Sequence, residues 1–243
     1  MGRTSPPSPA AVLSVPRVLH ASMDAFADPK AVARYAENPP RMVPGYADMQ
    51  RMAMLLMAER APVDGEILVL GAGGGLEMKV FAEAQPGWSF VGIDPSAAML
   101  DLAKLTLGDL AARATLHEGF IESAPDGPFD AAACILTLHF IERQERLRTL
   151  GEVRKRLKPG SPFVVAHYSI PHGEIDVWMS RFAAFATSSG MQPSEAERAR
   201  ATVIERLPIL SPDDDERLLA EAGFGGVRLF YAGFAFRGWV AYA

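Results

Sequence analysis

Cysteine is almost absent from the sequence, and this limits the kinds of site that the chain can form. Cys134 is the only cysteine in 243 residues. An intrachain disulfide and a cysteine-rich zinc site are therefore excluded. A lone cysteine inside an apolar run is typical of a buried core residue, and the composition is compatible with a reducing compartment. We expect a cytoplasmic protein.

Long apolar runs are also absent. The longest, at 131–141, is about half the length that a helix needs to cross a bilayer. Four prolines between residues 6 and 16 interrupt the N-terminal segment, which leaves no apolar core for a signal peptide. We therefore expect neither a membrane span nor a secretory signal.

The composition that is present predicts a folded, acidic protein. The chain has 24 Lys and Arg against 29 Asp and Glu, a net charge of −5, and 49% of its residues are hydrophobic. Eight of the 19 prolines lie in the first 44 residues, so we predict a flexible tail over 1–20 and one domain over 21–243. Within that domain we expect an N-terminal helical cap at 21–62 and a helical insertion at 174–207, placed where a substrate lid is common.

From Gly65 onward, short apolar runs alternate with helical stretches, which is the pattern of an α/β fold with an interior, mostly parallel sheet. A methionine-rich helix at 46–60 precedes them and is expected to pack in the core. The predicted strands are 66–70, 89–93, 114–117, 129–136 and 161–167, and the helices between and after them are 75–84, 96–107, 141–157 and 213–222. Two aromatic strands, 226–231 and 234–242, should close the chain as an antiparallel hairpin that turns at Ala232 and Gly233.

The first of these strands runs into a glycine loop, Gly71-Ala-Gly73-Gly74-Gly75, and then into a helix. Such a loop lets a ligand lie against bare main chain at a helix N-terminus. The next strand ends at Asp94, whose carboxylate is suited to accept both hydroxyls of a ribose. Leu76 stands where a dinucleotide fingerprint requires its third glycine, so the pattern is G-x-G-x-G and a nicotinamide dinucleotide is not expected.

These landmarks resemble those of the class I S-adenosylmethionine-dependent methyltransferases. The likeness continues through Asp94-Pro95, Glu118-Gly119-Phe120, Phe129-Asp130 and Pro159-Gly160, over about 180 residues. It implies a Rossmann-like, seven-stranded, mostly parallel sheet with a C-terminal antiparallel hairpin, and S-adenosylmethionine as cofactor. The residues that it places around the cofactor are Gly71, Ala72 and Gly73 at the amino-acid part, Asp94 at the ribose, Pro95, Met99, Phe120 and Ile121 at the adenine, and Ile135 beneath it.

A narrower branch, the carboxy-S-adenosylmethionine synthases of tRNA modification, is also similar. There the resemblance gives Tyr46 a cofactor contact and gives Arg200, or less closely Arg198, a pairing with the extra carboxylate of a carboxylated donor. Val69 and Ile135 depart from that branch's pattern. Three functions therefore stay open: methyl transfer to a small molecule, carboxy-S-adenosylmethionine synthesis, and cofactor binding without catalysis.

Three residues at strand ends are candidates for the acceptor site. His139 is a candidate general base, and His167 and Tyr168 are candidates for lining the acceptor pocket. An acceptor that is already nucleophilic would need no base. The histidines lack the spacing of a metal site, so no metal is expected.

The partner we expect is a small-molecule substrate. The basic segment 143–158 carries interleaved glutamates, as a solvated helix face does, so nucleic acid is not expected to bind. The sequence does not decide whether the protein forms a homodimer.

Overall fold

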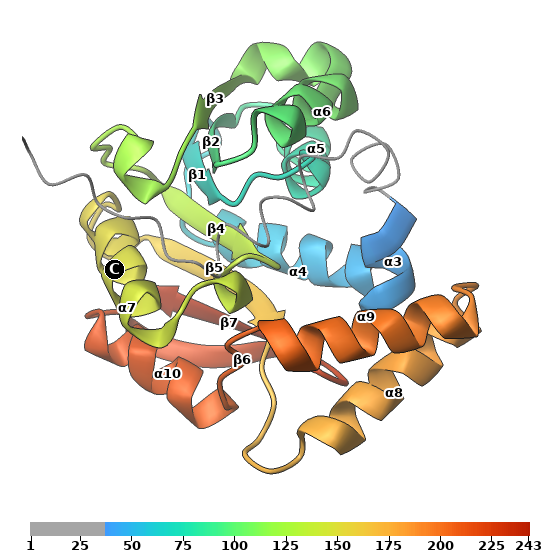
Figure 1. Ribbon diagram of the computed structural model, residues 1–243. Helices are drawn as coiled ribbons and strands as arrows, with labels where there is room; N and C mark the ends of the chain where they lie inside the picture. The colour runs from blue at the N-terminus through green and yellow to red at the C-terminus, as the bar shows by residue number, and fades with distance from the viewer. Residues whose placement is uncertain (1–36) are drawn as a thin grey trace, which may run out of the picture.

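In the computed structural model, residues 37–243 are described, and they form one seven-stranded sheet between two layers of helices (Figure 1). The predicted tail at 1–20 and the first part of the predicted cap lie outside the described residues. The strands are β1 (Glu66–Leu70), β2 (Ser89–Asp94), β3 (Ala114–Glu118), β4 (Ala131–Ile135), β5 (Pro162–Tyr168), β6 (Gly225–Gly233) and β7 (Phe236–Tyr242).

The strand order is β3-β2-β1-β4-β5-β7-β6, and β7 runs antiparallel to the other six strands. The order reverses between β1 and β4, and ligands of open α/β sheets bind outside the carboxyl ends of the strands at such a switch point. The predicted fold class is confirmed.

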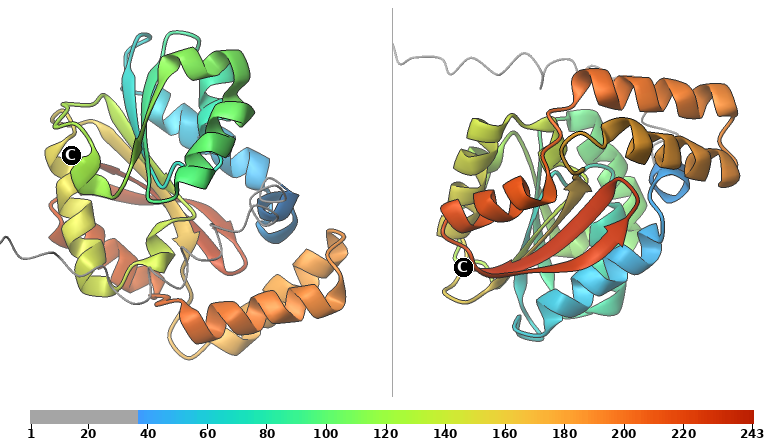
Figure 2. Two further views of the ribbon diagram at one scale, coloured as in Figure 1. Left: turned by 45° about the horizontal axis from the view of Figure 1, so that its top comes forward. Right: turned by 90° about the horizontal axis from the view of Figure 1, so that it is seen from below.

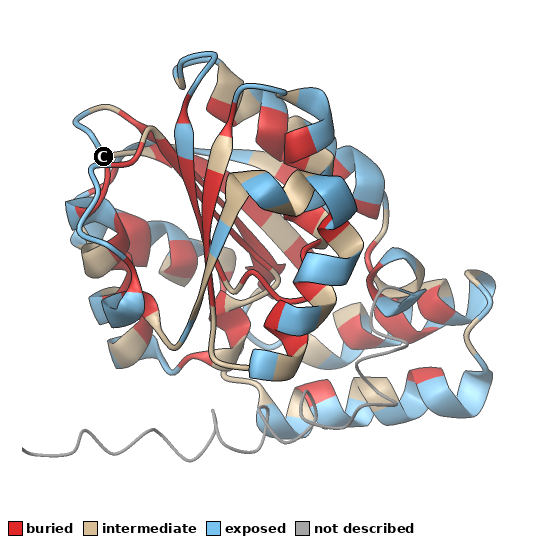
Figure 3. Cartoon of the chain, turned by 90° about the horizontal axis from the view of Figure 1, so that it is seen from above, coloured by how far each residue is buried: buried red, intermediate tan, exposed pale blue. Residues whose placement is uncertain are grey.

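Helices cover both faces of the sheet. One face carries α4 (Tyr46–Ala58), α5 (Leu76–Ala84) and α6 (Ala97–Leu107), and the other carries α7 (Arg143–Lys155) and α10 (Pro212–Glu221) (Figures 1 and 2). Figure 3 shows the result: the strands between the layers are buried, and exposed residues gather on the outer helix faces. The methionine-rich helix packs in the core as predicted, because Met49, Met54 and Met57 of α4 are buried there.

The insertion between β5 and α10 is a helical hairpin. It consists of α8 (Ile175–Ser188) and α9 (Pro193–Arg206), which pack against each other and project from the body of the domain (Figure 2). The short helix α3 (Asn38–Met42) packs against α8, so the N-terminal cap and the insertion meet at one end of the sheet. Among the described residues, no helix combines the length and apolar character of a membrane span.

Most predicted boundaries differ from the structure by one or two residues, as at α7, which was predicted at 141–157, and two of the differences affect the argument. β4 begins at Ala131 and ends at Ile135, inside the predicted 129–136, because Phe129 forms only an isolated bridge and Leu136 turns out of the strand with φ 57°. The C-terminal hairpin turns at Phe234 and Ala235 instead of two residues earlier, since β6 continues to Gly233. Gly233, which predicted the turn, belongs to β6 and pairs with Phe236 of β7.

Candidate functional site: a cavity at the carboxyl ends of the strands

A cavity of about 410 Å³ opens at the carboxyl edge of the sheet. It runs from the glycine loop after β1 to the end of α9, and it therefore joins the predicted donor site to the insertion. Cavities of this size are typical of small-molecule sites. Seven of the predicted cofactor residues line it, namely Gly71, Gly73, Asp94, Pro95, Met99, Phe120 and Ile121.

The backbone of the glycine loop has a conformation that residues with side chains rarely adopt. Gly71, Gly73 and Gly75 all have positive φ, and the Thr137 Oγ1 atom lies 2.0 Å from the position that a Cβ on Gly71 would take. A side chain at Gly71 would thus be both strained and in collision with Thr137. The loop leaves bare main chain facing the cavity at the start of α5.

Asp94 ties this loop to the start of α6. Its Oδ2 accepts a hydrogen bond from Gly73 N–H and its Oδ1 accepts one from Ser96 N–H, both at 2.9 Å. Burial raises the pKa of Asp94, and those two hydrogen bonds oppose the shift. Each carboxylate oxygen keeps a second lone pair, so the same carboxylate that orders the loop is able to accept hydroxyl groups from a ligand.

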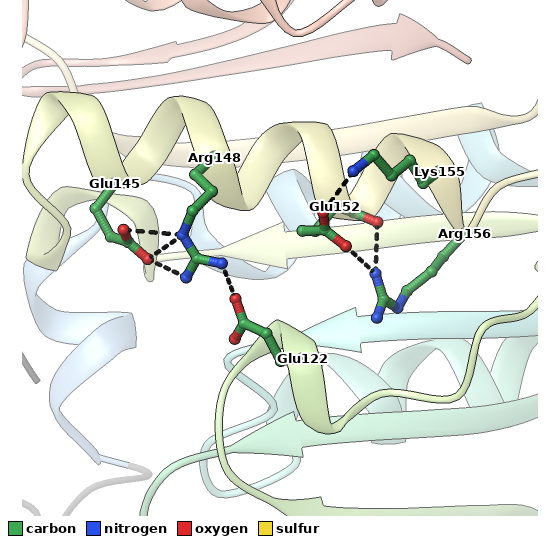
Figure 4. Close-up of polar contacts among 6 residues, drawn as sticks. All are labelled: Glu122, Glu145, Arg148, Glu152, Lys155 and Arg156. Atoms are coloured by element: carbon green, nitrogen blue, oxygen red, sulfur yellow. Dashed lines mark hydrogen bonds and ion pairs between the residues drawn. The ribbon is translucent and has the colours of Figure 1, made fainter. Parts of the chain in front are cut away.

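An ion-pair network lies next to the predicted adenine region, between α7 and the segment after β3. Arg148 of α7 pairs with Glu145 on the same helix and with Glu122 in the short 3₁₀ turn η3 (Ile121–Ser123), as Figure 4 shows. Arg148 and Glu145 line the cavity. The network holds the segment after β3 against α7.

The turn after β4 brings further residues into the cavity. Leu136, in the left-handed region, and Thr137 both line it, whereas Ile135 does not. The sequence did not indicate these two residues, because the apolar run predicts a strand that continues through Leu136. A non-glycine residue with positive φ beside a cavity often marks a functional turn, but such a φ has no sequence signal at a leucine.

Three other predicted cofactor residues do not line the cavity. Ala72 is fully buried in the core, and Tyr46 packs in the same core from α4. Arg200 pairs with Asp176 of α8 and Glu197 of α9 and does not line the cavity. Arg206, one turn and a half further along α9, lines the cavity instead, and it has no ion pair within residues 37–243.

The two adjacent candidates at the end of β5 face opposite sides of the sheet, because side chains alternate along a strand. Tyr168 lines the cavity and stacks on Phe236 at a ring-centroid distance of 4.2 Å. His167 lies on the other face, where its Nε2 is 3.1 Å from the Asp215 carboxylate. The structure therefore brings Tyr168 but not His167 into the cavity.

His139 also lines the cavity, within the 3₁₀ turn η4 (Leu138–Phe140). Its side chain is 3% exposed, and its Nδ1 accepts a hydrogen bond of 3.4 Å from the backbone N–H of Tyr168. Burial holds the pKa of His139 well below its ordinary value, and the charges of His167 and Arg146 lower it further. The imidazole is therefore neutral near pH 7.

The acceptor end of the cavity is mainly apolar, with Asn38, Thr202 and Arg206 as its polar residues. Its lining comes from distant segments: Met42 and Val43 after α3, Val203 and Leu207 on the insertion, and Phe236 on β7. No motif links these residues in the sequence, so sequence reasoning could not assemble them. Within residues 37–243, no three His, Cys, Asp or Glu side chains gather as a metal site.

The basic residues of the segment 143–158 are engaged within the protein. They bond to carboxylates or to backbone carbonyls, as in the pairs Arg143–Glu221, Lys155–Glu152 and Lys158–Asp130 (the second of these is drawn in Figure 4). Charges held in this way are less available to phosphates.

Comparison with known proteins finds a methyltransferase domain in this chain. A family model described as a methyltransferase domain matches residues 68–163. The carboxy-S-adenosyl-L-methionine synthase of Campylobacter fetus subsp. fetus is 22% identical over 218 residues, which cover 88% of this chain and 93% of that protein. The synthase of Colwellia psychrerythraea is 25% identical over 223 residues, covering 88% and 90%.

Solved structures of methyltransferases share the fold. Magnesium protoporphyrin IX methyltransferase from Synechocystis PCC 6803 superposes with a TM-score of 0.67 at 14% identity, over 92% of this chain and 99% of that one. Human N-acetylserotonin methyltransferase in complex with S-adenosylmethionine gives a TM-score of 0.64 at 15% identity, over 94% of this chain and 60% of the human chain. The chain thus has the fold of the class I S-adenosylmethionine-dependent methyltransferases, and its residues 68–163 match a methyltransferase domain.

Proposed function

We propose that this protein transfers the methyl group of S-adenosylmethionine to a small, largely apolar acceptor. One observation carries the proposal: a single cavity of about 410 Å³ joins the glycine loop and Asp94 to the apolar end formed by α3 and α9. A donor at one end and an acceptor at the other would then meet at the turn after β4. Holding the two reactants together in line supplies much of the rate of such a transfer.

The residues of the donor end fit the cofactor. Bare main chain at Gly71 and Gly73 leaves room for its amino-acid part, and Asp94 offers acceptors for its ribose hydroxyls. Apolar contacts from Met99 and Ile121 suit the adenine ring. When bound, S-adenosylmethionine supplies an electrophilic sulfonium methyl group.

The acceptor end supports a small molecule as the substrate. Its lining is mainly aliphatic and aromatic, and the α8–α9 hairpin bounds it on one side. Apolar walls exclude water from the reacting atoms. The basic residues of α7 are engaged by carboxylates or, for Arg154, by a backbone carbonyl, which argues against a nucleic-acid substrate.

Mass spectrometry of ligand released from the denatured, freshly purified protein tests the donor, and formation of S-adenosylhomocysteine with a panel of small acceptors tests the transfer. We expect calorimetry to show S-adenosylmethionine binding in the wild type. A protein that binds the donor but forms no S-adenosylhomocysteine with any acceptor would instead be a cofactor-binding protein without catalysis. Absence of donor binding would refute the proposal.

A second candidate is carboxy-S-adenosylmethionine synthesis, and the observation that favours it is the similarity to curated synthases over 88% of the chain. The predicted partner of the extra carboxylate, Arg200, is engaged by Asp176 and Glu197 away from the cavity. Arg206 is the arginine of α9 that a carboxylate in the cavity would meet.

Competition between the plain and the carboxylated donor separates the two candidates. A synthase should prefer the carboxylated donor, and alanine at the responsible arginine should remove that preference while leaving plain-donor affinity unchanged. The comparison uses the wild type, Arg200→Ala and Arg206→Ala. A wild type that shows no preference would exclude the second candidate.

A further inference from the structure

His139 is a buried histidine whose hydrogen bonding fixes the position of its proton. A backbone N–H can only donate, so the Nδ1 that faces Tyr168 N–H at 3.4 Å must be the unprotonated nitrogen. In a neutral imidazole the other nitrogen, Nε2, then carries the hydrogen. The ring nitrogen that is left for a ligand is therefore a donor.

The surroundings hold the ring in this orientation. β4 ends at Ile135, so the Tyr168 amide lies beyond the last ladder pair of β4 with β5 and takes His139 as its partner. The ring lies between Phe140 at 4.3 Å and Tyr168 at 4.9 Å between centroids. Rotation of the ring would break this hydrogen bond and leave the buried Tyr168 N–H without a partner.

The charged groups around His139 also disfavour a second proton. Arg146 and His167 lie on the opposite face of the sheet from the cavity. There the carboxylate of Asp215 pairs with both of them. The Tyr168 hydroxyl is kept neutral, because burial raises its pKa. His139 thus stays neutral, with its proton on Nε2.

The other ionisable residues that line the cavity within residues 37–243 offer no free base. Asp94 holds the glycine loop, Glu145 is paired with Arg148, and arginine does not accept a proton near pH 7. A neutral alcohol would have no group to take its proton. An oxygen that is already ionised would need none.

We propose that His139 presents a fixed Nε2–H donor to the acceptor, and that the site methylates an oxygen that arrives already ionised, as in a carboxylic acid or an acidic phenol. This inference rests on the proposed function. The acceptor O⁻ forms a bond to the methyl carbon while the C–S bond breaks and leaves its electron pair on sulfur. The oxygen and the sulfonium both become neutral, and no proton moves to the protein.

The tautomer is directly measurable by NMR. The chain has five histidines, and long-range ¹⁵N–¹H spectra of ¹⁵N-histidine-labelled protein distinguish Nδ1–H from Nε2–H rings, with His139→Gln assigning the signal. With S-adenosylhomocysteine bound, we expect an Nε2–H tautomer that does not titrate between about pH 5.5 and 8.5. An Nδ1–H tautomer, or protonation in that range, would overturn the inference.

Ligand binding tests the chemical class. The probes are benzoate and 4-nitrophenolate, each paired with an uncharged relative, benzamide and 4-nitroanisole, in the presence of S-adenosylhomocysteine. We expect at least one ionised probe to bind more tightly than its uncharged relative. His139→Phe should weaken that binding about tenfold or more, since a hydrogen bond to a charged group is lost. Equal affinity for ionised and uncharged probes, or no binding of any, contradicts the inference.

His139→Gln separates a donor from a base. Glutamine offers an amide N–H and an acceptor oxygen but cannot take up a proton, so it should keep ionised-probe affinity within a few-fold of the wild type. His172→Gln, in an exposed side chain away from the cavity, is the matched control and should change nothing. Calorimetry with S-adenosylmethionine on each variant keeps the two proposals apart. If the donor binds but His139 titrates, only this inference fails.

Discussion

The guanidinium of Arg146 and the carboxylate of Asp215 form an ion pair that is closed off from water. Their Nη1 and Oδ1 atoms are 2.8 Å apart, and the two side chains are 0% and 2% exposed. Arg146 also donates to the backbone carbonyls of Ile141 and Pro208. The pair thereby joins α7 and the turn after β4 to α10 and the segment that returns from the insertion.

Removing one partner of this pair should be strongly destabilising. Asp215→Ala leaves a buried guanidinium without its carboxylate, and such a change costs about 3–5 kcal/mol. Urea unfolding monitored by circular dichroism measures it. The double variant Arg146→Met/Asp215→Leu should be more stable than Asp215→Ala, because no buried charge remains. A loss below about 1 kcal/mol for Asp215→Ala would show that the pair contributes little.

The same pair predicts a pH dependence. Burial raises the pKa of Asp215, but His167 and Arg146 outweigh burial and hold that pKa below its ordinary value. The stability from this group is therefore complete above the ordinary carboxyl range and is lost as the pH falls through the lowered pKa. Asp215→Asn should flatten the acid limb of the stability curve, and an unchanged acid limb would contradict the assignment.

Asp94→Ala should weaken S-adenosylmethionine binding at least about tenfold. The variant removes a charged acceptor worth about 1.5–3 kcal/mol per hydrogen bond. It also removes the hydrogen bonds that Asp94 accepts from the N–H groups of Gly73 and Ser96. Isothermal calorimetry measures the affinity. Asp101→Ala, at an exposed position on α6, is the control and should bind as the wild type does.

Gly71→Ala should cost more than the strain of a positive φ alone. Gly45 provides the comparison, because it is in the left-handed region with φ 63° and ψ 33°, and a Cβ there would meet nothing within 4 Å. Gly45→Ala should therefore cost about 1–2 kcal/mol. Gly71→Ala must in addition displace Thr137, so we expect a larger loss of stability and a loss of donor affinity. Equal losses for the two variants, measured by urea unfolding, would mean that Thr137 gives way freely.

Glu77 should make the protein less stable as the pH rises. Its side chain is 6% exposed, and burial raises its pKa from 4.5 to about 8. Between those values the folded state holds a proton that the unfolded state has lost, so the free energy of unfolding falls by about 1.4 kcal/mol per pH unit from this group. Glu77→Gln should remove that slope in urea unfolding at pH 5 to about 8. The exposed Glu83→Gln should leave it unchanged.

That the residues of the proposed donor end share one cavity was predictable from sequence, because they are local. Gly71, Gly73 and Asp94 follow consecutive strands, and the apolar runs marked β1 to the residue. The acceptor end was not, because Val203, Leu207 and Phe236 approach the cavity only through the tertiary fold. Period-two alternation could have separated His167 from Tyr168, since adjacent strand residues face opposite sides. Which of Arg200 and Arg206 faces the cavity depends on the rotation of α9 about its axis. The hydrophobic pattern of the sequence alone did not fix that rotation.

The α8–α9 hairpin lies outside the stretch of chain that matches the methyltransferase domain. The matched methyltransferase domain at 68–163 contains Gly71, Gly73 and Asp94, whereas the hairpin enters the chain after β5 and contributes to the cavity only through the last turn and a half of α9 and the residue that follows. Under the proposed function, the donor residues and the apolar wall that α9 gives the acceptor are thus encoded in separate stretches of the gene. Exchange of one hairpin for another would then alter which acceptor fits while the methyl donor stays the same.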